Sequence, residues 1–325
     1  MGTGKVIQST RSKLFPKVVA AVALSVSVSL LGYGLYANWN ELSTYKWSIN
    51  YLYLSVSVLM YPISLLVLIL VWHSIMRRME IKLSLSQDLR MYCYTNLARR
   101  LPGAALWHVG GRVYLYGREG VPRSVSALGT FLELALHSLA GVLVFLASRP
   151  FYPHHDVLRN DLFLVLIIPM MVVVADPSFL NNTAVWLLHR FSSGEVAPIA
   201  FTRRGLLTWM ALYSFSWVCA GVVLYLLVET IYPASTINFA TITGIGAGVV
   251  ALSSVANFVP IGLGREITMS LLLSRYIPSS MAIVVSLLFR LLSILAEMFW
   301  AFVFLLLSNY VPKLMAACHF WRKLR

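Results

Sequence analysis

The sequence predicts an all-α integral membrane protein, built as a bundle of about seven to eight transmembrane helices. Hydrophobic residues make up 59% of the chain and charged residues only 12%, whereas a typical soluble domain carries about 25% charged residues. The mean hydropathy is +0.77. Several apolar stretches reach the roughly 20 residues that a helix needs to cross about 30 Å of hydrocarbon. Most of the surface is therefore expected to face lipid.

Apolar stretches with almost no charge are predicted to cross the membrane as helices, because lipid offers no hydrogen-bond partner to the backbone. We expect one transmembrane domain over 1–325, with a basic N-terminus at 1–17 that is retained and a short basic tail at 309–325. An eighth crossing at 258–276 would place both ends on one side. The clear spans are 18–38, 50–73, 124–148, 161–176, 206–231, 237–256 and 280–308.

The net charge of +14 is concentrated in alternate loops. Loops 74–123 and 177–205 are rich in Lys and Arg, so the positive-inside rule predicts that they are cytoplasmic together with the N-terminus. Loops 39–49, 149–160 and 232–236 are then outside. This distribution favours a multi-pass protein of the inner (plasma) membrane whose basic face meets anionic lipid headgroups. It does not favour nucleic acid as a partner.

Two segments, 91–118 and 257–276, are apolar but broken by proline and glycine, and both contain arginine. Non-helical backbone at membrane depth is tolerated only where protein or a water-filled cavity covers it, so both are candidates for re-entrant segments. Their offset of about 157 residues predicts a weak internal repeat, with chance similarity between apolar sequences as the alternative. Such matched, broken segments point to a transport site. The matching residues are Asn96, Pro102 and Gly103 in the first segment and Asn257, Pro260, Gly262 and Gly264 in the second.

These segments resemble the two motifs of one family. The first is Asn-x-x-x-x-Leu-Pro-Gly at 96–103, with Arg112 downstream, and the second is Asn-x-x-Pro-x-Gly-Leu-Gly-x-Glu at 257–266, followed by Arg290. The family is the lysylphosphatidylglycerol synthase transmembrane region, also called flippase-like. The resemblance covers roughly 15–310, and Ile261 stands where many relatives have glycine.

The resemblance implies a protein that moves or handles a lipid with a charged or glycosylated headgroup, either a phospholipid or a polyprenyl-linked lipid. In the best-known members this region flips an aminoacylated phospholipid, which a separate soluble domain makes. The sequence ends shortly after its last predicted helix, so we expect no aminoacyl transfer, and it carries no enzyme signature, cofactor motif or metal motif. The alternative is a non-transporting membrane partner that presents a lipid to a glycosyltransferase or an aminoacyltransferase.

Charges inside predicted helices identify candidate site residues. A carboxylate at the centre of a membrane helix costs about 2.5–3.5 kcal/mol, so Glu133 should face a polar partner or cavity, as should Arg290. The two charges either line a headgroup path or form a structural salt bridge with each other. Arginine binds phosphate bidentately, which makes the arginines of the broken segments candidates too. The predicted headgroup path comprises Asn96, Pro102, Gly103, Arg112, Glu133, Asn257, Pro260, Gly262, Gly264, Arg265, Glu266 and Arg290.

A small-residue pattern, Gly244-x-x-x-Gly248, lies in the predicted span 237–256. No strand precedes it, so a phosphate-binding loop is not expected. The pattern instead predicts a face on which another helix packs closely.

Overall fold

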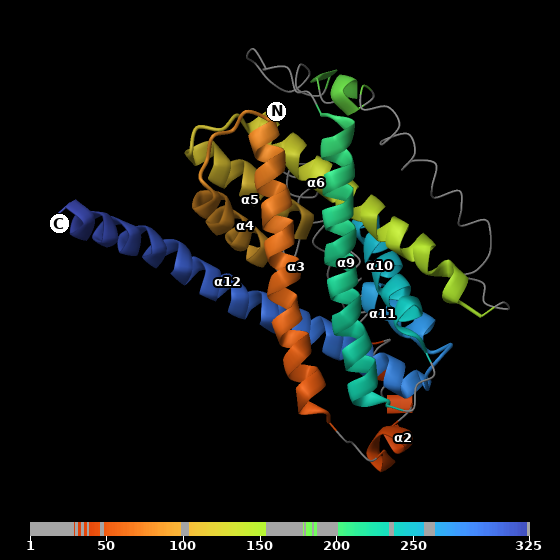
Figure 1. Cartoon of the computed structure of the whole chain (residues 1–325). Helices are drawn as coiled ribbons and strands as arrows, with labels where there is room; N and C mark the ends of the chain where they lie inside the picture. The colour runs from red at the N-terminus through yellow and green to blue at the C-terminus, as the bar shows by residue number, and fades with distance from the viewer. Residues whose placement is uncertain are drawn as a thin grey trace, which may run out of the picture.

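A computed structural model describes residues 39–45, 49–98, 104–153, 201–233, 237–256 and 264–323, with short stretches between 29 and 37 and between 178 and 186. Every regular element within these residues is helical (Figure 1), which confirms the all-α fold. In chain order the main elements are α2 (Trp39–Thr44), α3 (Tyr51–Arg78), α4 (Leu85–Ala98), α5 (Ala104–Arg118), α6 (Arg123–Ser148), α9 (Arg203–Ile231), α10 (Phe239–Ala256), α11 (Gly264–Leu273) and α12 (Ser279–Lys323), and a short 3-10 turn follows α6 at Arg149–Phe151.

Four helices of the described residues are long and apolar enough to cross a membrane: α3, α6, α9 and the first 29 residues of α12. They coincide with the predicted spans 50–73, 124–148, 206–231 and 280–308. Helix α10 covers the predicted span 237–256. The predicted spans 18–38 and 161–176 lie outside the described residues.

The helices in the second part of the two broken segments are short. Helix α5 has 15 residues and α11 has 10, which gives about 22 and 15 Å at 1.5 Å per residue. Neither length reaches the roughly 30 Å of a hydrocarbon core. Of the expected eighth crossing at 258–276, the described residues contain α11, which covers about half of that depth, while 258–263 lie outside the described residues. A re-entrant segment fits this length better.

Two groups of three helices repeat the same order in the chain. In each group a helix leads to a short helix and then to a long one, as α4, α5 and α6 and again as α10, α11 and α12 (Figure 1). The two groups pack against each other, because α6 contacts α10 and α12 contacts α4. The third helix of each group thus lies against the first helix of the other, and this arrangement supports the predicted internal repeat.

Helices α6, α9 and α10 pack closely because small residues lie at their contacts. A Cβ added to Gly141 of α6 would lie 2.7 Å from the Cβ of Ala251 on α10 and 3.1 Å from the ring of Trp217 on α9. A Cβ at Gly244 would collide with Ser148 and Tyr152, and one at Gly248 would press on Phe145. The predicted packing role of Gly244 and Gly248 is confirmed.

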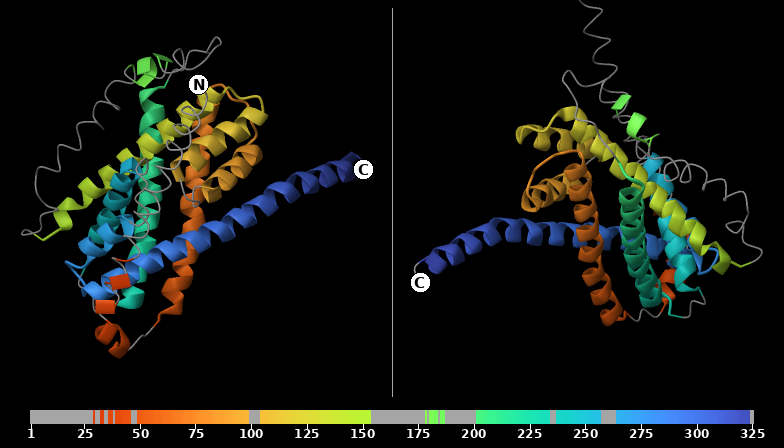
Figure 2. Two further views of the ribbon diagram at one scale, coloured as in Figure 1. Left: turned by 180° about the vertical axis from the view of Figure 1, so that it is seen from behind. Right: turned by 45° about the horizontal axis from the view of Figure 1, so that its top comes forward.

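The ends of the long helices lie at two opposite ends of the bundle (Figure 2). Helix α3 is antiparallel to α9, because Trp209 near the start of α9 donates from Nε1 to Ser74 Oγ near the end of α3, at 3.0 Å. At the other end, the Tyr45 hydroxyl donates to the carbonyl of Ile231 at 2.7 Å. The basic residues of the loops before α4, between α5 and α6 and before α9 therefore share one end, as the loop charges predict. They are Arg77, Arg78, Lys82, Arg118, Arg123, Arg203 and Arg204.

Candidate functional site

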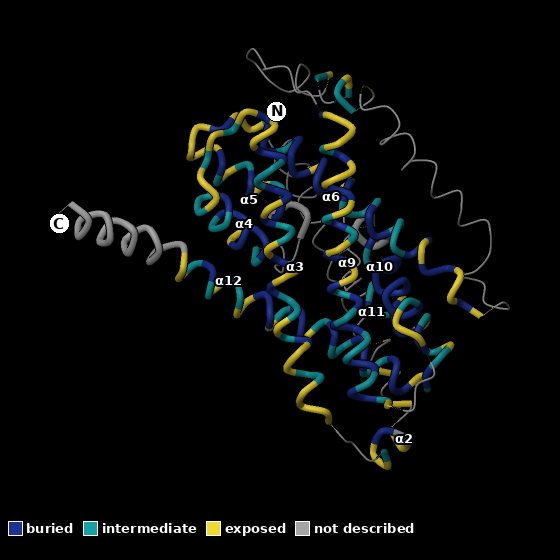
Figure 3. The backbone as a smooth tube through the Cα atoms, viewed as in Figure 1, coloured by how far each residue is buried: buried dark blue, intermediate teal, exposed yellow. Residues whose placement is uncertain are grey.

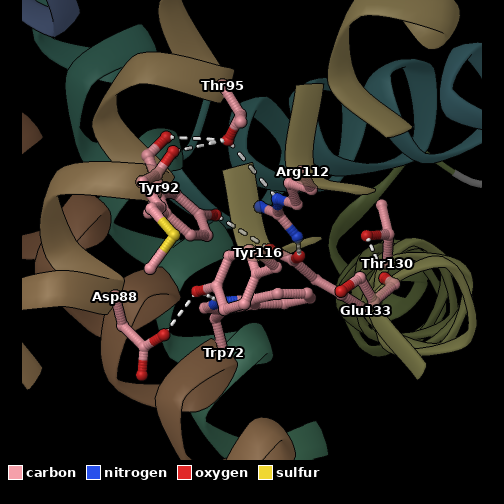
Figure 4. Close-up of polar contacts among 10 residues, drawn as sticks. Trp72, Asp88, Tyr92, Thr95, Arg112, Tyr116, Thr130 and Glu133 are labelled. Atoms are coloured by element: carbon pink, nitrogen blue, oxygen red, sulfur yellow. Dashed lines mark hydrogen bonds and ion pairs between the residues drawn. The ribbon is translucent and has the colours of Figure 1, made fainter. Parts of the chain in front are cut away.

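A buried ion pair joins the first broken segment to the helix that follows it. Arg112 of α5 donates from Nη1 to the carboxylate of Glu133 on α6, and both side chains are buried (Figure 4). The hydroxyl of Tyr92 on α4 donates to the second oxygen of this carboxylate, Oε1, at 2.8 Å. The structure pairs Glu133 with Arg112 and Arg290 with Glu266, so it does not form the alternative salt bridge between Glu133 and Arg290.

Aromatic rings surround the buried guanidinium. The Cζ atom of Arg112 lies 3.9 Å from the centroid of the Trp72 ring and 4.6 Å from that of Tyr92. Both distances are within the range of cation–π attraction, which strengthens when water is excluded. The Nε atom lies 3.5 Å from the hydroxyl of Thr95. Arg112 is 0% exposed, so its charge is stabilised by protein groups and not by water.

Hydrogen bonds continue from this ion pair toward α3 and the start of α4. Trp72 donates from Nε1 to the Tyr116 hydroxyl at 2.6 Å, and Tyr116 donates to the carboxylate of Asp88. The other oxygen of Asp88 lies 2.5 Å from Nδ1 of His73. Asp88 is buried, whereas the His73 side chain is 25% exposed. The buried polar residues thus form a connected series that reaches the surface at one histidine.

Sequence reasoning missed His73, Asp88 and Tyr116. Helical spacing offered a signal for one of them: Asp88, Tyr92 and Thr95 recur at i, i+4 and i+7, which places them on one face of a helix. An acidic residue on the same face as a predicted site motif could have been singled out. His73 and Tyr116 carry no such pattern, and only the tertiary structure brings them to Asp88.

The second group of three helices (α10, α11 and α12), which we call the second repeat, contains an ion pair of its own. Glu266 of α11 lies 2.8 Å from Nη1 of Arg290 on α12, and Nε of Arg265 lies 3.0 Å from the other carboxylate oxygen of Glu266. Glu266 is buried, but the side chain of Arg290 is 34% exposed. Two arginines thus lie against one buried carboxylate, and their outer parts are accessible.

The two ion pairs have opposite polarity. In the first repeat the short helix supplies the cation and the long helix the anion, whereas in the second repeat Glu266 is on the short helix and Arg290 on the long one. Glu133 and Arg290 are 157 residues apart, the offset of the predicted repeat. Each broken segment is therefore tied to its long helix by a charge pair.

The remaining predicted site residues are placed as follows. Asn96 is buried near the end of α4, and Gly264 is the first residue of α11. His137, four residues after Glu133 in α6, stacks on Trp217 with ring centroids 4.4 Å apart. Five residues of the predicted path fall in stretches that the structure does not describe: Pro102, Gly103, Asn257, Pro260 and Gly262.

These features define a polytopic membrane protein whose short, broken segments carry charges into a helical bundle. The family model of the lysylphosphatidylglycerol synthase TM region matches residues 18–301, nearly the whole chain. The chain belongs to this family, and the resemblance of its two motifs is confirmed. A comparison with curated proteins gives no match.

Proposed function

We propose that the protein translocates a lipid with a charged or glycosylated headgroup across the membrane, without being an enzyme itself. Membership of the family supports a flippase-like, lipid-handling role. The observation that carries the proposal is the second ion pair, because a charge within a membrane helix is costly unless it is paired or has a function. Arg290 is paired and still about one-third exposed.

Arg265 and Arg290 are the proposed contacts for the headgroup phosphate. A guanidinium can bind a phosphate with two parallel hydrogen bonds, and both side chains are partly exposed beside buried Glu266. Arg112 has the same chemistry, but it is buried under Trp72 and Tyr92. We therefore propose that the headgroup path runs along the second repeat. In this conformation the Arg112–Glu133 pair stabilises the fold and does not contact the headgroup.

An open groove on the outer side of α5 supports recruitment of an anionic lipid. It encloses about 420 Å³ and carries two arginines but no acidic residue in its lining. Basic residues near a membrane surface attract anionic lipids by about 1 kcal/mol each. The groove lies at the basic end of the bundle, which we take to be the cytoplasmic side of the plasma membrane. Its lining residues are Gly110, Val113, Tyr114, Gly117, Arg118 and Arg123.

Translocation is tested with purified protein in liposomes that contain a fluorescent phosphatidylglycerol. A membrane-impermeant reductant destroys only outer-leaflet fluorescence in empty vesicles, so a protein that moves the lipid extends the loss to the inner leaflet. Arg290→Gln is expected to slow this second phase by removing the proposed phosphate contact. Arg275→Gln, in the turn after α11, is the matched control and should behave as the unchanged protein.

The second candidate function is presentation of a lipid to a glycosyltransferase or aminoacyltransferase without translocation. The same groove and arginines favour lipid binding in either case. Inner-leaflet fluorescence that survives in vesicles of correctly folded protein would exclude translocation. In that case native mass spectrometry would support lipid presentation if phosphatidylglycerol stays bound to the unchanged protein and is lost from the Arg290→Gln variant.

A further inference from the structure

The groove on the outer side of α5 has a positively charged end. Its lining includes Arg118, the last residue of α5, and Arg123, the first residue of α6. Both residues are exposed, and neither forms an ion pair with any residue that the structure describes. Two positive charges therefore line this groove without a counter-charge from the described part of the chain.

The turn between α5 and α6 brings the two arginines to the same groove. The N–H of Val121 donates to the carbonyl of Tyr116 at 3.1 Å, and that of Gly120 donates to Gly117 at 3.2 Å. With a φ of +82° at Gly120, these are the two bonds of a Schellman motif, which ends a helix at a left-handed glycine. Val121 and Tyr116 are both buried, so the turn is anchored in the bundle. Helix α6 then begins at Arg123, at the end of the bundle where α3 ends and α9 begins (Figure 1).

The rest of the groove is uncharged and follows one face of α5. Gly110, Val113, Tyr114 and Gly117 recur at i, i+3, i+4 and i+7, which places them on one side of a helix. From Gly110 to Arg118 the helix extends about 12 Å at 1.5 Å per residue. The groove therefore suits an amphiphilic molecule with an anionic group at one end and an apolar chain behind it.

The packing of α5 does not require glycine at the two glycines of the groove. An added Cβ at Gly110 or Gly117 would have no described atom within 4 Å, whereas one at Gly111 would touch Thr95 at 3.4 Å. Neither Gly110 nor Gly117 has a positive φ, and glycine is unfavourable inside a helix. What these glycines provide is an open face, which the fold of the described residues leaves unfilled.

A second groove at the same end of the bundle differs in its charge. It encloses about 450 Å³ and contains a carboxylate beside its two cations, since it is lined by Arg77, Glu80, Ile81 and Lys82. The α5 groove has no acidic residue in its lining. The acidic residue next to Arg118 in the sequence, Glu119, accepts a hydrogen bond from Nε2 of Gln87 at 3.1 Å and does not line the groove. The α5 groove thus offers nothing to balance a cation in a ligand.

We propose that the α5 groove selects an anionic phospholipid whose phosphate is not balanced by a cation in its own headgroup. The phosphate lies between Arg118 and Arg123, where guanidinium groups form charge-assisted hydrogen bonds with it, and the first part of an acyl chain lies along Gly117 and Gly110. This deepens the proposed function, on which it rests, by naming the charge class of the lipid. Phosphatidylglycerol belongs to this class.

Lipids with an ammonium group in the headgroup are disfavoured at this groove. Phosphatidylethanolamine carries one ammonium, and an aminoacylated phosphatidylglycerol carries at least one. Such a group would lie beside two arginines with no carboxylate to receive it, and a like charge of this kind acts against the wrong ligand. The groove therefore favours unmodified phosphatidylglycerol over its aminoacylated form.

Photo-cross-linking tests this selectivity with the full-length protein in nanodiscs of phosphatidylcholine. The probe is phosphatidylglycerol with a diazirine in an acyl chain close to the glycerol, and mass spectrometry locates the cross-linked peptides. Cross-links are expected within 104–118, and excess phosphatidylglycerol should remove them, whereas excess phosphatidylethanolamine or lysylphosphatidylglycerol should not. Each of Arg118→Gln and Arg123→Gln should lower cross-linking of this segment about fivefold.

Matched variants separate the groove from general surface charge. Arg77→Gln/Lys82→Gln removes two cations from the other groove at the same end, and it should leave cross-linking of 104–118 unchanged. Gly117→Leu fills the α5 groove where no described atom lies nearby, so cross-linking should fall while the melting temperature stays the same. Equal losses in the Arg77/Lys82 and Arg118/Arg123 double variants, or full cross-linking in Gly117→Leu, would overturn the site. Equal competition by phosphatidylglycerol and lysylphosphatidylglycerol would overturn the selectivity.

This experiment does not depend on lipid movement. If the liposome assay shows no translocation, the proposed function fails, but charge-selective cross-linking of 104–118 still establishes the binding site. If translocation occurs and the cross-links do not distinguish the three competitors, the proposed function stands and the selectivity of the α5 groove is overturned.

Discussion

The two repeats each contain an ion pair, but the surroundings of the two pairs differ. In each repeat the short helix of the broken segment carries a charge that pairs with a charge on the following long helix. The Arg112–Glu133 pair is enclosed by aromatic rings and by the Tyr92 hydroxyl (Figure 4), whereas the cation of the Glu266–Arg290 pair is about one-third exposed. Figure 3 shows buried and exposed residues interspersed along the long helices, including α9. Equal motifs thus do not imply equal roles, because burial decides whether a charge can meet a ligand.

The energetics of the two pairs should differ accordingly. Two charges removed from water are stable only if hydrogen bonds and close contacts satisfy them, and the first pair has such contacts on several sides. The second pair has one buried and one partly exposed partner, so we expect it to contribute less to stability. The first pair is therefore expected to support the fold, and the second to remain available for binding.

The largest effect is expected from breaking the first pair. Glu133→Ala leaves a buried guanidinium without its counter-charge, which should cost about 3–5 kcal/mol of unfolding free energy. Expression level and melting temperature in detergent measure this loss. The double variant Arg112→Met/Glu133→Ala should recover much of it, because neither charge then remains buried alone. A double variant as unstable as the single would show that the pair is not the cause.

Disturbing the packing between the two repeats should have a smaller effect. Gly141→Ala brings a methyl group to 2.7 Å from Ala251 on α10, and such overpacking typically costs about 1–3 kcal/mol. The control is Gly110→Ala, where an added Cβ has no atom within 4 Å. The melting temperature should fall only for Gly141→Ala, and equal values would contradict close contact between α6 and α10.

A double-mutant cycle on Glu266 and Arg290 should give a coupling energy of about 1 kcal/mol or less, because solvent screens the pair. The same cycle on Arg112 and Glu133 should give several times more. Chemical unfolding of the single and double variants measures both. Equal coupling energies for the two ion pairs would show that their difference in burial does not change their contribution to stability.

The smallest effect on stability, but a clear effect on labelling, is expected from cysteines at the two ends of the bundle. Lys82→Cys and Ile49→Cys lie just beyond the two ends of α3, and a membrane-impermeant thiol reagent on intact cells distinguishes them. With a cytoplasmic basic end, only position 49 is labelled from outside. Labelling at position 82 from outside would show that the protein has the opposite orientation in the membrane.

The fold was predictable where the signal is local. Apolar length identified α3, α6, α9, α10 and the spanning part of α12, because lipid forces each such stretch to form its own backbone hydrogen bonds. The partners of the buried charges were not predictable in the same way. Glu133 was recognised as a residue that needs a partner, but it pairs with Arg112, 21 positions away, because α5 folds back onto α6.

The polar residues around Arg112 illustrate the same limit. A tryptophan near the end of an apolar span typically lies at the membrane interface, yet Trp72 is buried against the guanidinium of Arg112. His73 and Tyr116 meet through Asp88 only after three helices have packed. Contacts among distant residues depend on helix packing, which apolar periodicity alone does not specify.

The length of α12 has a mechanical consequence. The helix has 45 residues, of which Ser279–Leu307 have the character of a membrane span, and its far end projects from the bundle (Figure 1). The remaining 16 residues, 308–323, extend about 24 Å at 1.5 Å per residue. A rigid tilt of about 10° in the span would displace that end by about 4 Å over this length. Because Arg290 belongs to the same helix, a tilt at the second ion pair is expected to move the far end as well, as far as the helix stays straight through Pro312.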